Sequence, residues 1–207
     1  MRAQLRWLIL LFVLCYIPLF HFLAKPAIVI WDEALYANNA LDMAIHKNFW
    51  VLHYNGEVCI SNTKPPLVIW LQCLGIWLLG PTELPIRLPS ALAAFMTCLA
   101  VFYFAKYSLK NEKIGLGAVL FLITARGIVR AHVARTGDLD AMLVCWITVY
   151  ALLALHFLLH HVDNYQRLFR WIGLSIFLAF MTKSIAGLMP ILGLFWPCLR
   201  WVAAVMY

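Results

Sequence analysis

The sequence contains few charged residues. Asp, Glu, Lys and Arg together make up 12% of its 207 residues, whereas hydrophobic residues make up 65%. Soluble domains carry about 25% charged residues, and a soluble fold of this length has no interior large enough to bury so much apolar surface. The shortage of charge therefore excludes an ordinary soluble domain and predicts an integral membrane protein.

The usual signs of disulfide, metal or nucleic-acid chemistry are also missing. No CxxC pair is present, and five of the six cysteines lie inside apolar runs, where a thiol acts as a small hydrophobic group. The spacing of His46 and His53 is not typical of metal ligands. The net charge of +7 is scattered rather than gathered along one helix face. The sequence therefore predicts no metal site, no cofactor and no nucleic-acid partner.

Long apolar runs are present instead, and they predict a polytopic helix bundle. Residues 7–23 follow Arg2 and Arg6 and have no small-residue cleavage site after them, so this run is interpreted as a signal anchor. Further membrane helices are predicted within residues 88–107, 114–133, 141–159 and 171–199. The last run is too long for one span, so we expect two helices that meet near Lys183. The predicted fold class is all-α, with about six transmembrane spans.

Residues 66–80 form a shorter apolar run. As a helix, these 15 residues would extend about 22 Å. That length is less than the bilayer core of about 30 Å. Trp70 and Trp77 suit the boundary between lipid and water, so we expect a helix that lies at the membrane interface.

An inner N-terminus places residues 31–87 in an outer loop. The chain then comprises a first helix (1–30), an outer catalytic loop with interfacial helices (31–87) and the remaining helices (88–207), as one membrane domain. Eight basic residues fall on each side, so the usual excess of inner positive charge is missing. Basic residues retained outside indicate an anionic ligand at the outer membrane surface.

An acidic pair, Asp32 and Glu33, follows the first predicted helix. A carboxylate beside a membrane surface is a candidate general base, because desolvation and a like-charged neighbour raise its pKa. The alternative is that Asp32 caps a helix that begins at Glu33 and stabilises its dipole. The sequence leaves both roles open.

Lys64 lies in the segment Asn62-Thr63-Lys64-Pro65-Pro66, directly before the predicted interfacial helix. The prolines preset the start of that helix, and backbone N–H groups at a helix start bind anions. Lys64 is therefore a candidate phosphate ligand. The alternative is an interfacial lysine that only extends its charge towards water.

Ionisable residues crowd the segment before the helix predicted at 141–159. They are Arg126, Arg130, His132, Arg135, Asp138 and Asp140. Arg126 and Arg130 are four residues apart and share one helix face. Such groups near the bilayer are costly and usually functional, although Asp138 and Asp140 also suit helix capping. We favour a functional site.

Lys183 lies between two apolar runs. A lysine at mid-membrane costs about 2.5–3.5 kcal/mol, so we expect it at an outward turn between two helices. It is either a ligand of the outer-face site or a turn residue without a further role.

Four motifs, in this order, resemble those of the GT-C membrane glycosyltransferases. They are Asp-Glu-x-x-Tyr-Ala from Asp32, Lys-Pro-Pro from Lys64, Ala-Arg-Thr-Gly-Asp-Leu-Asp from Ala134, and Phe-Met-Thr-Lys-Ser…Leu-Met-Pro from Phe180. The resemblance spans roughly residues 1–190. It is greatest to the bacterial branch that contains the lipid A aminoarabinose transferase and to related protein O-mannosyltransferases.

The resemblance implies a reaction at the outer, periplasmic face of a bacterial inner membrane. A sugar on a polyprenyl phosphate would pass, with inversion, to a hydroxyl of a lipid, glycan or protein acceptor. By resemblance, Asp32 is the catalytic carboxylate, Glu33 its neighbour in the acidic pair and Asp140 the second outer acid. Lys64 would hold the donor phosphate. The further candidates for substrate binding are Tyr36, Arg130, Arg135, Asp138 and Lys183, and fixed cations among them would stabilise the leaving phosphate.

The chain is shorter than GT-C enzymes usually are, so we expect it to lack the soluble outer domain that many of them carry. Two other functions fit the same residues. One is a component of a lipid-phosphate transporter or flippase, which needs no general base. The other is an inactive, truncated membrane remnant.

Overall fold

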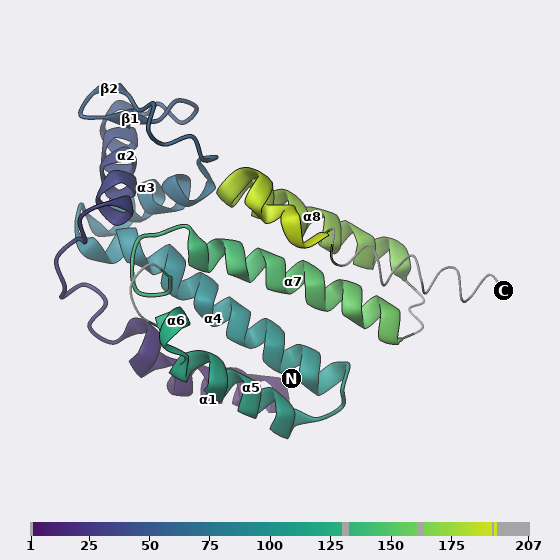
Figure 1. Ribbon diagram of the computed structural model, residues 1–207. Helices are drawn as coiled ribbons and strands as arrows, with labels where there is room; N and C mark the ends of the chain where they lie inside the picture. Colours follow the sequence, from purple (N-terminus) through teal and green to yellow (C-terminus); the bar gives the residue numbers. More distant parts are fainter. Residues whose placement is uncertain (1, 130–132, 161–163, 192, 194–207) are drawn as a thin grey trace.

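The computed structural model describes residues 2–129, 133–160, 164–191 and 193, which are mostly helical (Figure 1). The helices in chain order are α1 (Arg2–Cys15) with the π-helical turn η1 (Tyr16–Phe20), α2 (Asp32–His46), α3 (Leu67–Leu79), α4 (Glu83–Tyr107), α5 (Glu112–Thr124), α6 (Arg126–Val129), α7 (Asp140–Leu159), α8 (Tyr165–Lys183) and the 3-10 turn η2 (Ser184–Gly187). A short antiparallel hairpin, β1 (His53–Tyr54) and β2 (Glu57–Val58), lies between α2 and α3. The predicted all-α class is confirmed.

The long helices run side by side, and the smaller elements gather at one end of them. In Figure 1, α1, α4, α5, α7 and α8 form the bundle, and α2, the hairpin and α3 lie at its left-hand end. α4 packs against α5 and α7, and α7 packs against α8. The start of α7 and the end of α8 point towards the same end. This end therefore brings together parts of the chain that are far apart in sequence.

Three described segments are long and apolar enough to cross a membrane. They are Glu83–Tyr107, Asp140–Leu159 and Tyr165–Gly187. The predicted spans at 88–107 and 141–159 are thus confirmed, and the chain is an integral membrane protein. The run at 66–80 forms a separate short helix, Leu67–Leu79, and the first run forms the short helix Gln4–Phe20.

The prediction of one continuous helix within residues 114–133 was wrong. α5 ends at Thr124, because Ala125 is extended (ψ 116°), and α6 covers only Arg126–Val129. The Thr124 hydroxyl donates to the Leu120 carbonyl (2.7 Å), a bond that competes with the helix ladder. A charged guanidinium two residues further on makes continuation through lipid costly.

α8 begins earlier than predicted and ends where the turn was predicted. Its first turn is capped by Asn164, whose side chain accepts the Arg167 N–H (3.0 Å). It ends at Lys183, because Ser184 has a φ of 51°, outside the helical region. In the range of the predicted second helix, residues 184–187 form the 3-10 turn η2, whereas residues 192 and 194–199 lie outside the described residues.

Two buried clusters hold the elements in place. One joins α2, α3, α4 and α7, and includes Tyr36, Ile69 and Cys145; the other joins α1, α4 and α5. Small residues allow close helix contacts, as membrane helices require: a Cβ on Gly75 would lie 2.8 Å from the Pro85 Cβ. The first cluster fixes α2 and α3 to the end of the bundle, which sets the geometry of the candidate site.

Candidate functional site

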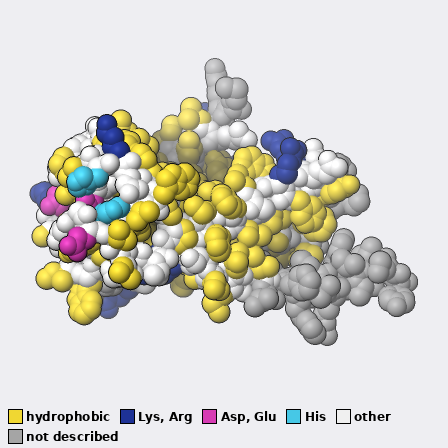
Figure 2. Space-filling view, turned by 90° about the horizontal axis from the view of Figure 1, so that it is seen from above, with side chains coloured by type: hydrophobic (Ala, Val, Ile, Leu, Met, Phe, Trp, Pro, Cys, Tyr) yellow, Lys and Arg dark blue, Asp and Glu magenta, His cyan; other side chains and the backbone are white. Residues whose placement is uncertain are grey.

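Most of the predicted site residues meet at the end of the bundle where α2 and α3 lie. Burial raises the pKa of the Tyr36 phenol above its ordinary value. The negative charges of Asp32, Asp138 and Asp140 raise that pKa further. Tyr36 therefore stays a neutral hydrogen-bond donor. In a view from above, acidic and histidine side chains gather at this end, and apolar side chains cover most of the middle (Figure 2).

Asp32 is the first residue of α2, and its side chain is exposed. The N-cap of the helix is Trp31, with a φ of 96°, and no side chain caps this end. The interpretation of Asp32 as a helix cap was therefore wrong. The Asp32 carboxylate makes no hydrogen bond or ion pair with any residue that the structure describes, so both of its oxygens can accept a proton from a substrate.

Glu33, the next residue, has the opposite environment. One carboxylate oxygen accepts from Arg87 Nε (2.7 Å) and the Gly137 N–H (2.8 Å), and the other accepts from Arg87 Nη2 (3.1 Å) and the Val29 N–H (2.7 Å). Burial alone would raise the pKa of Glu33, but these bonds and the charge of Arg87 hold it below its ordinary value. A buried carboxylate with four donors suits a positioning role rather than that of a base.

Arg87 is the residue that sequence reasoning missed. Its guanidinium is 1% exposed and, besides Glu33, it donates to the carbonyls of Leu23 (2.9 Å), Pro26 (2.7 Å) and Ala27 (2.8 Å). It therefore ties α4 to the start of α2 and to the linker before it. A lone arginine in the first turns of a membrane helix was the available signal, because such a charge needs a partner.

The segment before α7 is held by side chains from three helices. Glu33 of α2 accepts the Gly137 N–H, and Gln72 of α3 donates to the Gly137 carbonyl (2.9 Å). Ser90 of α4 donates to the Asp138 carbonyl (2.8 Å). A Cβ at position 137 would lie only 2.5 Å from Ile86 Cγ2, so this close approach requires glycine. The backbone that carries Asp138 and Asp140 is thus fixed.

Asp138 and Asp140 differ in their contacts. Asp138 is buried and accepts from the Thr136 hydroxyl (2.6 Å). Asp140 is the first residue of α7, and its carboxylate forms an ion pair with Lys183 Nζ (2.5 Å) at the end of α8. The N-cap of α7 is Leu139, without a side-chain cap, so Asp140 does not cap the helix. The structure thus joins two predicted site residues that are 43 positions apart.

Lys64 lies close to Tyr36 on the other side of the site. Its ammonium is 5.9 Å from the centre of the Tyr36 ring, at the outer limit of a cation–π contact. It forms no ion pair with the part of the chain that the structure describes. α3 begins three residues later, at Leu67, and the first N–H groups of a helix have no partner within that helix. An anion between Lys64 and that helix start would meet positive potential from both.

The two arginines of the predicted site are not brought to Lys64 by any described contact. Arg135 donates to the carbonyls of Pro18 (3.0 Å) and His21 (2.7 Å), so its guanidinium anchors the end of the first helix. Arg130 lies outside the described residues.

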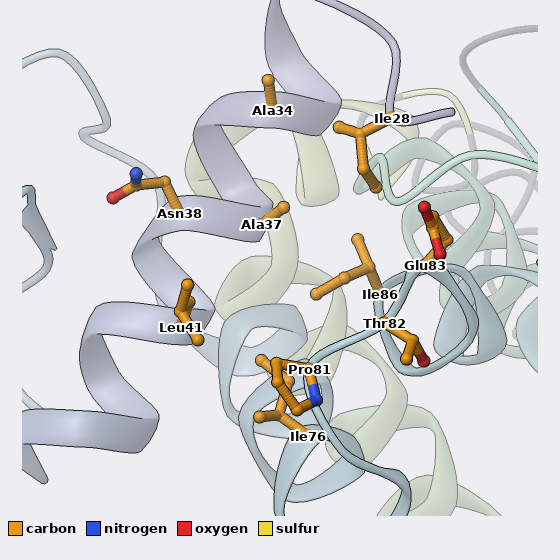
Figure 3. Close-up of a pocket in the computed structure, with 10 residues that line it drawn as sticks. All are labelled: Ile28, Ala34, Ala37, Asn38, Leu41, Ile76, Pro81, Thr82, Glu83 and Ile86. Atoms are coloured by element: carbon orange, nitrogen blue, oxygen red, sulfur yellow. The ribbon is translucent and has the colours of Figure 1, made fainter. Parts of the chain in front are cut away.

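A cavity of about 360 Å³ lies between α2 and the turn that joins α3 to α4 (Figure 3). Its α2 wall is formed by Ala34, Ala37, Asn38 and Leu41, and the view shows Ala37 on the side of α2 that faces Ile86. Helix periodicity places Asp32 and Tyr36 on the opposite face of α2. The cavity is therefore separate from the candidate site.

Known proteins resemble this chain in sequence and in fold. The family model described as dolichyl-phosphate-mannose-protein mannosyltransferase matches residues 63–204. The undecaprenyl phosphate-alpha-4-amino-4-deoxy-L-arabinose arabinosyl transferase of Pectobacterium atrosepticum is 28% identical over 159 residues, which are 76% of this chain and 28% of that protein. The enzyme of the same name from Pseudomonas savastanoi pv. phaseolicola is 31% identical over 179 residues, covering 84% of this chain and 31% of that one.

Two solved structures of ArnT from Cupriavidus metallidurans share the fold. The structure bound to undecaprenyl phosphate has a TM-score of 0.70 and 18% identity, and covers 94% of this chain and 37% of that one. The apo structure has a TM-score of 0.71 and 20% identity, and covers 99% of this chain and 39% of that one. The chain thus spans less than two fifths of the length of these relatives.

Proposed function

Because the chain belongs to the dolichyl-phosphate-mannose-protein mannosyltransferase family, we propose that it transfers a sugar from a polyprenyl phosphate to an acceptor hydroxyl at the outer face of a bacterial inner membrane. The observation that carries this proposal is that α2 presents on one face an exposed carboxylate, Asp32, and the Tyr36 ring with the Lys64 ammonium over it, and neither charge has an ion-pair partner among the described residues. The similar proteins act on undecaprenyl-phosphate-linked sugars by name, which supports the same class of donor here.

The proposed reaction is one displacement at the anomeric carbon. The acceptor oxygen forms a bond to this carbon, and the bond from the carbon to the phosphate oxygen breaks. Asp32 takes the proton of the acceptor hydroxyl. The leaving phosphate keeps the electron pair, and its negative charge is stabilised by Lys64 and by the start of α3. One displacement inverts the configuration of the sugar.

The remaining residues hold or shape the site in this proposal. Glu33, through Arg87, fixes the start of α2 and so the position of Asp32. The ion pair of Asp140 and Lys183 closes the side formed by α7 and α8, and Tyr36 donates a hydrogen bond to the substrate. Such pre-organisation of charged groups is the main source of rate enhancement at a water-poor site.

Sugar transfer by the chain in liposomes tests the proposal. The donors are undecaprenyl phosphate carrying labelled 4-amino-4-deoxy-L-arabinose or labelled mannose, with liposome lipids and an added glycan or peptide as acceptors. We expect transfer that falls at least about 100-fold in Asp32→Asn and clearly in Lys64→Ala. Glu57→Gln and Lys47→Ala, exposed residues of the same outer segment, are the matched controls.

Each other outcome is informative. Donor movement across the liposome membrane without transfer, unchanged in Asp32→Asn, would indicate a transporter and contradict the proposal. An inserted chain that neither transfers nor moves the donor would contradict it as well.

A further inference from the structure

Two buried asparagines connect α2 to the loop that carries Lys64. The Asn39 side chain is fully buried and that of Asn62 is 6% exposed. Asn62 Nδ2 donates to Asn39 Oδ1 (2.9 Å), and Asn39 Nδ2 donates to the His53 carbonyl (2.7 Å). Buried amides of this kind remain only where their hydrogen bonds are made. The hydrogen bond between the two side chains therefore helps to fix the position of each asparagine.

The face of α2 that carries the candidate site continues to Asn39. Asp32, Tyr36 and Asn39 are spaced i, i+4 and i+7, so they lie on one side of the helix. The same side faces the Lys64 loop, since Lys64 lies over the Tyr36 ring and Asn62 bonds to Asn39. The three residues thus form one row from the proposed base to the support of the proposed phosphate ligand.

The backbone at Lys64 is fixed from both directions. Asn62 Oδ1 accepts the Lys64 N–H (3.2 Å), which closes a turn across Thr63. On the other side, Pro65 and Pro66 restrict the backbone before α3 begins. The ammonium has no acidic partner among the described residues, so its position depends on this backbone.

From this geometry we propose that Asn39 and Asn62 are positioning residues that hold Lys64 in place for the donor phosphate. The proposal rests on the proposed role of Lys64 as a phosphate ligand. A lysine side chain has many rotamers, and ordering it on binding lowers affinity. A backbone fixed in advance restricts the ammonium to a smaller volume, so less conformational entropy is lost when the phosphate binds.

The neighbouring Asn38 provides a matched control. It also bonds to the hairpin, with Nδ2 donating to Asn55 Oδ1 (3.0 Å) and Oδ1 accepting the Asn55 N–H (3.2 Å). It makes no described bond to the Lys64 loop. Loss of this side chain therefore weakens the hairpin attachment but leaves the support of Lys64 intact.

The test is the affinity of the full chain for undecaprenyl phosphate in nanodiscs. Asn62→Ala and Asn39→Ala are each expected to weaken binding by about tenfold, and Lys64→Ala by at least as much. Asn38→Ala should bind like the parent chain. In the Lys64→Ala background, Asn62→Ala should cause no further loss, because it acts only through Lys64. Thermal unfolding of each variant identifies any that no longer fold.

The outcomes separate this proposal from the proposed function. Unchanged affinity in Lys64→Ala would remove Lys64 as the phosphate ligand, and the proposed function of that residue would fail. A loss in Lys64→Ala with none in folded Asn62→Ala would overturn only the positioning role. An equal loss from Asn62→Ala in both backgrounds would also overturn it, because the effect would then not pass through Lys64.

Discussion

Two adjacent acids occupy opposite environments at the start of α2. Asp32 is exposed and makes no described bond, whereas Glu33 is buried and accepts four. The helix turns by about 100° per residue, so neighbours in sequence face different surroundings. The two acids therefore have different roles in the proposed function. Asp32 is available for proton transfer, and Glu33 holds the backbone at the start of α2.

The two acids should respond differently to loss of charge. Asp32→Asn is expected to remove transfer but to change stability by less than about 0.5 kcal/mol, as is usual for an exposed site. Glu33→Gln should lower stability by about 3–5 kcal/mol, because it leaves the buried Arg87 without its partner. Thermal unfolding in detergent, measured beside transfer, checks both. A Glu33→Gln chain as stable as the parent would contradict this account.

The ion pair of Glu33 and Arg87 also predicts a pH dependence. The pKa of Glu33 in the folded chain lies below its ordinary value of 4.5. A carboxyl whose pKa is lowered by folding stabilises the fold above the ordinary value and loses this contribution as pH falls through the lowered one. We expect the melting temperature to fall below about pH 4.5, and to fall less in Glu33→Gln. An equal fall in both chains would show that Glu33 is not the group responsible for the pH dependence.

The sequence predicted individual site residues but not the partners that the fold gives them. Asp32, Lys64, Asp140 and Lys183 were predicted from their positions at the ends of apolar runs and from the family resemblance, whereas the ion pair between the last two was not foreseen. Arg87 was missed because its partner Glu33 is 54 positions away, and only the folded chain brings them together. Contacts of this kind have no signal in spacing along the chain.

At the scale of elements, the segment before α7 is the most constrained part of the site. Its backbone is bonded to side chains of α2, α3 and α4, and it passes so close to Ile86 that Gly137 has no room for a Cβ. Three helices thus determine where Asp138 and Asp140 lie. A change in this packing should alter catalysis without touching a charged residue.

Gly137→Ala tests that prediction. The added methyl group should shift the segment and lower stability by about 1–3 kcal/mol, the usual cost of overpacking, and transfer should fall. Ile86→Ala in the same chain removes the clashing Cγ2 and should restore part of the activity. Transfer assays on the single and double variants check this, and an active Gly137→Ala chain would show that the close approach is unimportant.

Hydrophobic patterning located most elements but not all of their ends. It placed α4, α7 and the short α3 near their observed positions, because long apolar runs leave few alternatives in lipid. It missed the break after Thr124, where an apolar run continues while the backbone turns. Hydrophobic patterning does not show such a turn, since the turn depends on the backbone conformation of Ala125.

At the scale of the whole molecule, the site is built where the membrane helices end. Parts of α2, the Lys64 loop, the start of α7 and the end of α8 meet at one end of the bundle (Figure 1). The polar groups come from separate elements, and the fold brings Lys64 to Tyr36 and Lys183 to Asp140. In the proposed function, this arrangement supplies a proton acceptor, Asp32, and a phosphate ligand, Lys64, beside the lipid from which a polyprenyl donor would come.

Chemical rescue of Asp32 tests the central claim most directly. Asp32→Ala removes the proposed base and leaves a space beside the acceptor, which added formate can enter and use to accept the proton. We predict that formate restores part of the sugar transfer in Asp32→Ala and none in Lys64→Ala. Transfer that persists in Asp32→Ala without formate would contradict the account.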